Sequence, residues 1–236
     1  MTDGGRRRLR LAIFGDRLPD YPKHDRLEPA LCRAAVAAKV DLEVRWMSTT
    51  ALVPTTGGVP TTLDAVVVAP QSSEYCRNEE ALKRALRAVR ETDVPCLAVC
   101  GGTRYVLWAA VEAGAPAPCT GNIPTDRCTI GGGDFRGRHT VQLRSGALAA
   151  RVYGRTRVEE RFSCTRSLDP AVLPALRAAG IVDCGHTPRM GATLFEDAHC
   201  RFHLAALFLP HWNAGPPHPL FVALLREAVD RPPDRV

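Results

Sequence analysis

Short apolar runs alternate with longer segments of helical spacing over the first half of the chain. The runs at 63–70 and 94–99 are apolar almost throughout, which is typical of strands buried on both faces of a parallel sheet. The segments 78–91 and 103–114 that follow them carry apolar residues three and four positions apart, which predicts helices. Because strands that alternate with helices form βαβ units, this order predicts a parallel sheet with helices on both faces.

The other predicted elements complete an α/β fold. In chain order they are a strand at 9–16, a helix at 24–38, a strand at 41–47, antiparallel strands within 128–144 and 155–164, a helix at 169–180, strands at 189–197 and 202–210, and a helix at 218–229. We expect a single domain over residues 1–236, with residues 1–8 as a disordered tail.

Composition is that of an ordinary soluble globular protein, with 45% hydrophobic and 24% charged residues in 236. No apolar run approaches the roughly 18 residues that a membrane span needs. The basic N-terminus lacks an apolar stretch long enough for a signal peptide. We therefore expect a cytoplasmic protein that does not bind a membrane.

The net charge of +6 indicates an anionic partner. Nucleic-acid binding needs basic residues gathered on one face, whereas here the arginines are scattered among acidic residues and only Arg6–Arg8 form a run. We expect a small, anionic molecule as substrate and no nucleic acid.

The nine cysteines include no Cys-x-x-Cys pair, and disulfides are rare in the cytoplasm. His199 and His203 are four residues apart on a predicted strand, which places them about 13 Å apart, too far to share a metal ion. We therefore expect no metal, no cofactor and no disulfide.

One cysteine stands at a position suited to chemistry. In residues 95–105, "PCLAVCGGTRY", Cys100 ends a buried strand, and Gly101 and Gly102 lead directly into a helix. Ligands of open α/β sheets bind at the carboxyl ends of the strands, and a sharp strand-to-helix turn exposes a nucleophile there. The free N–H groups of the helix N-terminus would lower the thiol pKa and hold an oxyanion. A buried cysteine before a glycine turn is the alternative interpretation.

This segment resembles the nucleophile segment of class I glutamine amidotransferases, in particular the glutaminase domain of CTP synthase and its stand-alone relatives. The resemblance extends over most of the chain, including "LRLAIFGD" (9–16), "RVYGRTRVEERFSC" (151–164) and "LFLPHWNAGPPHPLFVALLREA" (207–228). It implies a flavodoxin-like three-layer α/β sandwich with a mostly parallel central sheet and a small antiparallel addition. It also implies Cys100 as nucleophile, and an amidoligase partner on a separate chain.

Several positions depart from the family motif. Ala98 and Arg104 stand where the family has glycine and glutamine, and Gln71 stands where the oxyanion loop has glycine. The His-Pro-Glu that supplies the catalytic base is replaced by Leu209-Pro210-His211. Leucine cannot accept a proton, so efficient glutamine hydrolysis is not expected.

The sequence leaves three functions open. Cys100 acts with His211 as a substitute base, or it attacks an ester, thioester or other electrophile that needs no full triad, or the protein is a catalytically silent metabolite- or partner-binding relative. We favour a cysteine-dependent acyl hydrolase or transferase, which acts alone, as a homodimer or with a biosynthetic partner chain. The candidate site residues are Cys100 and His211 for catalysis, Gly101, Gly102, Gln71 and Ser72 for backbone oxyanion contacts, and Arg104, Tyr75 and Trp212 for substrate binding.

Overall fold

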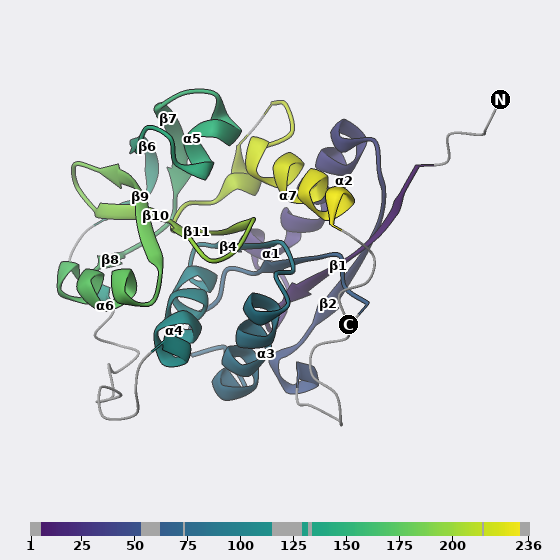
Figure 1. Cartoon of the computed structure of the whole chain (residues 1–236), viewed down its shortest axis with the longest axis horizontal. Coiled ribbons are helices and arrows are strands. Elements are labelled where there is room, and N and C mark those ends of the chain that lie inside the picture. The colour runs from purple at the N-terminus through teal and green to yellow at the C-terminus, as the bar shows by residue number, and fades with distance from the viewer. Residues whose placement is uncertain are drawn as a thin grey trace.

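The computed structural model describes residues 6–52, 62–72, 74–114, 129–131, 134–213 and 215–231. A nine-stranded sheet runs through the molecule (Figure 1). In spatial order its strands are β2 (Asp41–Met47), β1 (Arg8–Phe14), β3 (Ala65–Val68), β4 (Cys96–Val99), β11 (His203–Ala206), β10 (Gly191–Asp197), β9 (Ile181–Thr187), β6 (Gly137–Leu143) and β7 (Arg157–Phe162). Two further strands, β5 (Thr129–Gly131) and β8 (Arg166–Leu168), pair with each other.

The sheet is mixed. From β2 to β11 every neighbouring pair is parallel, which confirms the parallel sheet predicted from the apolar runs. From β11 to β7 every pair is antiparallel, so the antiparallel part is larger than the small addition we predicted. The predicted pairing within 128–164 is confirmed by β6 and β7.

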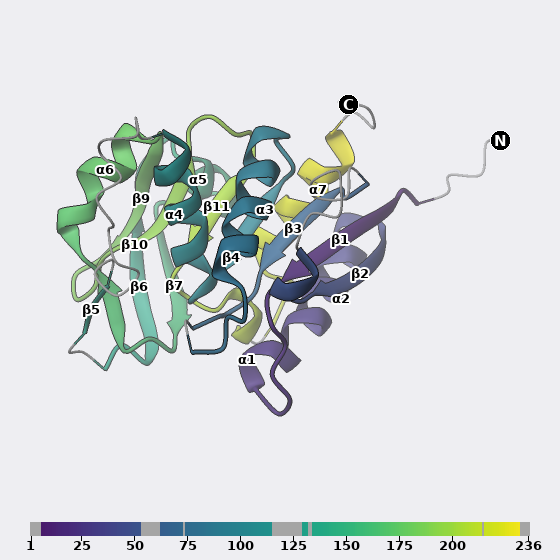
Figure 2. The same cartoon turned by 90° about the horizontal axis from the view of Figure 1, so that it is seen from below.

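Helices cover the parallel strands on both faces and make three layers (Figure 2). Helices α2 (Leu27–Ala38) and α7 (Pro219–Asp230) pack together on one face, and α3 (Glu79–Glu91) and α4 (Gly102–Gly114) pack on the other. Because successive strand side chains point to opposite faces, Leu11 and Ile13 of β1 belong to the first core, whereas Ala12 and Phe14 belong to the second. Burial of these two apolar layers is the main force that stabilises the fold.

The shorter elements correct several predicted boundaries. The helix predicted at 24–38 is divided at Arg26 into α1 (Pro22–Asp25) and α2. The strand predicted at 202–210 ends at Ala206, because Pro210 begins a 3-10 turn, η4 (Pro210–Trp212). The sequence did not predict β8, β9 or α5 (Leu148–Tyr153). The helix predicted at 169–180 forms two short helices, η3 (Pro170–Val172) and α6 (Leu173–Ala178), and η1 (Thr49–Leu52) is a further short helix.

The N-terminal segment is placed from residue 6 onward. Arg8 is the first residue of β1, and the Arg7 guanidinium donates hydrogen bonds to the carbonyl oxygens of Val229 and Arg231. The predicted tail therefore includes residues that pair with the sheet and with α7, while residues 1–5 lie outside the described part. Within the described ranges, no helix has the length and apolar character to cross a membrane.

Candidate active site

Cys100 occupies a strained corner between β4 and α4. Its φ of +53° lies in the left-handed region that residues with a side chain rarely adopt. Two backbone contacts hold it there, since the Cys100 N–H donates to the Ala206 carbonyl at 2.7 Å and its own carbonyl accepts from the Thr103 N–H at 3.2 Å. Strain of this kind persists only where the surroundings enforce it and is common at functional sites.

Both glycines after Cys100 are required by close packing of backbone. A Cβ at Gly101 would lie 1.9 Å from the Gln71 carbonyl oxygen, and a Cβ at Gly102 would lie 2.5 Å from that of Ala69. The corner is therefore pressed against the loop that follows β3, which brings the Gln71–Ser72 backbone next to the nucleophile.

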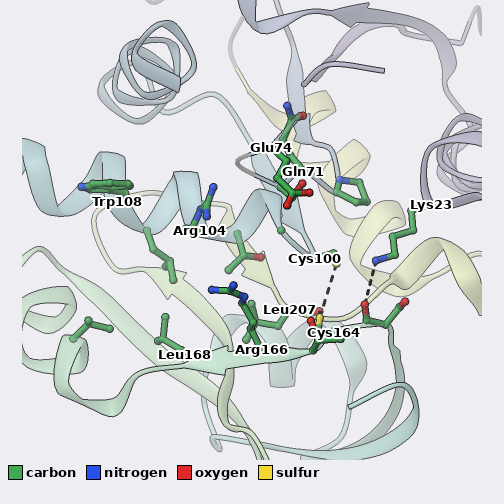
Figure 3. A pocket seen from close by; sticks show the side chains of 18 of the residues that line it. Lys23, Gln71, Glu74, Cys100, Arg104, Trp108, Cys164, Arg166, Leu168 and Leu207 are labelled. Atoms are coloured by element: carbon green, nitrogen blue, oxygen red, sulfur yellow. Dashed lines mark hydrogen bonds between the residues drawn. The ribbon is translucent and has the colours of Figure 1, made fainter. Parts of the chain in front are cut away.

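A cavity of about 500 Å³ opens beside this corner. It lies between α4, the loops after β3 and β7, and the β8–α6 segment (Figure 3). Cys100 and Gly101 line it together with the predicted Gln71, Ser72 and Arg104. Its wall also contains residues that the sequence did not single out, among them Tyr21, Lys23, Glu74, Leu107, Trp108, Val111, Cys164, Arg166, Leu168 and Leu176.

A second thiol and an ammonium group face Cys100. The Cys164 Sγ lies 3.9 Å from the Cys100 Sγ and 3.1 Å from the Leu207 carbonyl oxygen. The Lys23 Nζ donates to the Ser163 carbonyl at 3.1 Å, which holds the amine on the Cys100 side of the cavity (Figure 3). Neither residue could be placed here from the sequence, because α1 and the loop after β7 are remote in the chain.

These neighbours lower the pKa of Cys100. The largest cause is a hydrogen bond from Cys164 to the thiolate. Burial raises the pKa, but this hydrogen bond, the charge of Lys23 and the Gly101 N–H all lower it and together outweigh burial. The pKa of Cys164 is raised by the same hydrogen bond, so Cys164 remains a protonated donor. Burial disfavours the charge on Lys23, but the Cys100 thiolate and Tyr21 outweigh burial and raise its pKa. At neutral pH the arrangement therefore favours a thiolate beside an ammonium group.

Arg104 lines the cavity, although its guanidinium is engaged within the protein. Its Nη2 donates to the Tyr105 hydroxyl at 2.7 Å and lies 3.5 Å from the Glu79 carboxylate. Arg166, from β8, adds a second arginine to the wall. Among the described residues of the wall, Lys23 is a third cationic side chain and Glu74 is an acidic one.

The Gln71 backbone packs against the Cys100 corner, whereas the Gln71 side chain bonds Asp16. Its amide oxygen accepts from the Asp16 N–H at 2.9 Å, and its amide nitrogen lies 3.3 Å from the Asp16 carboxylate. The same carboxylate also accepts from the backbone N–H groups of Thr49 and Arg77 and from the Thr49 hydroxyl. Burial disfavours the charged form of Asp16, yet these hydrogen bonds outweigh it and lower its pKa. Asp16 therefore fixes three loops at the carboxyl edge of the sheet.

His211 does not line the cavity. It is buried at 3% exposure in η4, and neither ring nitrogen has a hydrogen-bonding partner. Burial lowers its pKa to about 3, so its imidazole is a weak base. Leu209, at the family's histidine position, is fully buried. No histidine is found among the described residues of the cavity wall, so the predicted base has no counterpart there.

The other two predicted substrate contacts also lie outside the cavity wall. Tyr75 is 47% exposed, and the Trp212 ring has the guanidinium groups of Arg26 and Arg161 each 5.5 Å from its centroid. Gly102 acts through packing at the corner and is not part of the wall. Trp212 therefore packs between the guanidinium groups of Arg26 and Arg161.

A histidine–carboxylate pair is present elsewhere. His218 Nε2 lies 3.0 Å from the Glu160 carboxylate, which also accepts from the Tyr153 hydroxyl and the Asn213 amide. Glu160 is buried, at 2% exposure. This cluster does not line the cavity and joins β7 to the start of α7.

Three potential metal ligands meet at the opposite edge of the sheet. The ligand atoms of Asp93, Cys200 and His203 lie within 4.8 Å of one another, before β4 and at the start of β11. Both Asp93 oxygens already accept hydrogen bonds from Arg201, and His203 Nε2 bonds the Val94 carbonyl. Asp93 is therefore accounted for by an ion pair with Arg201, and His203 by a buried hydrogen bond to the backbone.

The fold has counterparts among known proteins. The chain superposes on the glutaminase domain of Trypanosoma brucei CTPS, solved with bound acivicin, with a TM-score of 0.77 and 19% identity over 97% of this chain and 96% of that one. A glutamine amidotransferase of Thermotoga maritima gives a TM-score of 0.59 at 9% identity, covering 94% and 96% of the two chains. The fold is that of the class I glutamine amidotransferases.

Sequence comparison gives the same result for this amidotransferase-like chain. It is 29% identical to the CTP synthase of Thermomicrobium roseum and 25% identical to that of Pyrococcus furiosus, over 96% and 93% of its length. These alignments cover 45% and 44% of the two enzymes, so the chain spans less than half the length of these curated relatives. No family model matches the chain. The predicted resemblance to the CTP synthase glutaminase region is thereby confirmed.

Proposed function

We propose that this protein is a cysteine-dependent acyl hydrolase or acyltransferase that forms a thioester between Cys100 and a small anionic substrate. The observation that carries the proposal is the position of Cys100, held at a left-handed corner beside the cavity with Lys23 and Cys164 facing its sulfur. A buried structural cysteine needs neither the strain nor the neighbouring cation.

The reaction follows from these groups. The Cys100 thiolate attacks the acyl carbon, an S–C bond forms, and the carbonyl electrons move to the oxygen. Backbone N–H groups at Gly101 and Ser72, with the N-terminus of α4, would stabilise this oxyanion. When the tetrahedral adduct collapses, the bond to the leaving group breaks and that group takes a proton from Lys23. Water or an acceptor amine then attacks the thioester and gives a proton to the neutral Lys23 amine. The C–S bond breaks, and Cys100 leaves as a thiolate.

The missing imidazole restricts the leaving group. An amine leaves only when a nearby group protonates it, and that group must then regain a proton. In the family's motif a histidine has this role. Lys23, whose pKa is raised, stabilises the thiolate but releases its proton to a leaving group less readily than an imidazolium would. Esters and thioesters, whose leaving groups need less protonation, are therefore favoured over the amide of glutamine.

The cavity wall supports an anionic substrate with an apolar portion. Lys23 and Cys164 lie with Cys100 at one end, and Trp108 and Leu168 lie toward the other (Figure 3). The ammonium of Lys23 at the Cys100 end would attract a carboxylate or a phosphate, and the arginines at 104 and 166 also belong to the wall. The apolar end, which also includes Leu107, Val111 and Leu176, would take a hydrocarbon portion.

We expect Cys100 to react with iodoacetamide at pH 7 about fivefold faster than Cys32, because a lowered pKa increases the thiolate fraction. Lys23→Met should slow the labelling of Cys100 severalfold and raise its apparent pKa, whereas Lys23→Arg keeps the charge and should preserve most of the rate. Peptide mass spectrometry between pH 6 and 9 measures each site separately. Labelling of Cys100 no faster than of Cys32 in all three proteins would leave the non-catalytic binding protein as the better interpretation.

Acyl transfer itself is tested by intact-mass spectrometry. Incubation with carboxylate-bearing esters and thioesters should add one acyl mass to the wild type and none to Cys100→Ala, while glutamine should be hydrolysed poorly. Reactive Cys100 without an adduct from any member of such a panel would contradict the acyl chemistry but not the nucleophile.

A further inference from the structure

The acyl chemistry gives Cys164 no covalent role, although its thiol lies beside the nucleophile. Its sulfur lies 3.9 Å from that of Cys100, and both line the cavity. Cys164 lies in the loop between β7 and β8, and Cys100 lies at the turn before α4. Because neither cysteine is inside a helix or strand, side-chain rotation and a small loop movement can bring the sulfurs closer.

We propose that Cys100 and Cys164 form a reversible disulfide when a hydroperoxide enters the cavity, and that this bond inactivates Cys100 as a nucleophile until a thiol reduces it. The proposal concerns the cysteine of the proposed function. It requires a nucleophilic sulfur at position 100, but it does not require acyl transfer.

The first step oxidises Cys100. Its thiolate attacks one oxygen of hydrogen peroxide, an S–O bond forms and the O–O bond breaks. The departing hydroxide takes a proton from Lys23 or solvent and becomes water, so the sulfur becomes a sulfenic acid as peroxide is reduced. Hydrogen peroxide is small enough for the 500 Å³ cavity, which reaches the 7% exposed Cys100.

The second step joins the two sulfurs. The Cys164 sulfur attacks the Cys100 sulfur, the S–S bond forms and the S–O bond breaks. The hydroxide leaves with the proton of Cys164 as a second water. The sulfur atoms must approach from 3.9 Å to about 2.05 Å, the length of a disulfide. Two equivalents of a small thiol, or one dithiol, restore both cysteines.

Charge makes the second step depend on the first. The pKa of Cys164 is raised chiefly by its hydrogen bond to Cys100, then by burial and by the charge of the Cys100 thiolate. Conversion of Cys100 to the neutral sulfenic acid removes the thiolate that Cys164 faces, while burial continues to raise the pKa of Cys164 and the charge of Lys23 continues to lower it. Cys164 therefore loses its proton more readily after Cys100 is oxidised than beside the Cys100 thiolate.

Other described cysteines compete poorly for the oxidant. Burial raises the pKa of Cys96 and Cys184, and burial with nearby carboxylates raises that of Cys200 to about 12. Their thiolate fraction at neutral pH is therefore small, and peroxide should select Cys100.

The full-length reduced protein is treated with one equivalent of hydrogen peroxide, alkylated and digested for disulfide mapping by mass spectrometry. We expect a peptide pair linked through Cys100 and Cys164, loss of iodoacetamide labelling at Cys100, and recovery of both thiols with dithiothreitol. Cys32, an exposed thiol, should remain alkylated in the same digest and serves as the internal control.

The Cys164→Ser variant, whose hydroxyl can still donate a hydrogen bond to Cys100, separates this disulfide from simple oxidation. It should accumulate a dimedone-reactive sulfenic acid at Cys100 and proceed to irreversible sulfinic acid at least about tenfold faster than wild type. Equal rates of irreversible oxidation in wild type and Cys164→Ser, with no linked peptide, would overturn the disulfide. Failure of the acyl-adduct experiment alone would leave the disulfide intact, so the two proposals fail separately.

Discussion

The Gly101→Ala variant is expected to lose fast alkylation of Cys100 and about 3 kcal/mol or more of folding stability. The added Cβ would lie 1.9 Å from the Gln71 carbonyl oxygen and 2.8 Å from its carbonyl carbon, so backbone rather than a flexible side chain must move. Any movement opens the contact between the Cys100 corner and the loop after β3. Urea unfolding measures the stability, and iodoacetamide labelling of the folded protein at pH 7 measures the site.

Gly154→Ala is the matched control. Gly154 has a φ of +66° at the end of α5, and nothing lies within 4 Å of the position of an added Cβ. Its replacement therefore costs only the left-handed backbone, roughly 1 kcal/mol, and leaves Cys100 labelling unchanged. Equal losses in the two variants, with normal Cys100 labelling in both, would show that the corner tolerates a side chain at position 101 and does not fix the nucleophile.

The part of the site that lies along one stretch of chain could be predicted from the sequence. Cys100, Gly101 and Arg104 follow a strand whose apolar pattern is unambiguous, so their place at the carboxyl edge was determined by local pattern and by the topology of α/β sheets. The parallel half of the sheet was predictable for the same reason. The antiparallel half was less so, because β8 and β9 are short or irregular in their alternation.

The residues that face Cys100 could not be predicted, because tertiary packing brings them there. Lys23 comes from a four-residue helix and Cys164 from a loop, and neither segment carries a periodic signal. His211 was chosen for its chemistry and its nearness to the family's histidine position, yet a 3-10 turn buries it away from the cavity. A residue's place in an aligned motif fixes its backbone neighbourhood, but local turns decide where the side chain points.

The Asp16→Asn variant is expected to be less stable than wild type by about 3 kcal/mol, because an amide nitrogen would replace an oxygen in a site whose partners all donate. Asp16 is 3% exposed and accepts from Thr49, Gln71 and Arg77. We also expect slower alkylation of Cys100, since the Gln71 backbone packs against Gly101. Thermal unfolding and the iodoacetamide assay measure the two effects, and Asp134→Asn, at an exposed pair with Arg136, should change neither.

The dependence on pH identifies the charge of Asp16 as the cause. Its pKa is lower in the folded protein than in the unfolded chain, so its ionised form stabilises the fold above the unfolded value of about 4. That contribution is lost as pH falls through the lower, folded pKa, whereas Asp16→Asn has no such charge to lose. The stability difference between the two proteins should therefore be largest near neutral pH and narrow below pH 4. A difference that stays constant down to acid pH would assign the effect to side-chain shape, and Asp16 would then not hold the loops electrostatically.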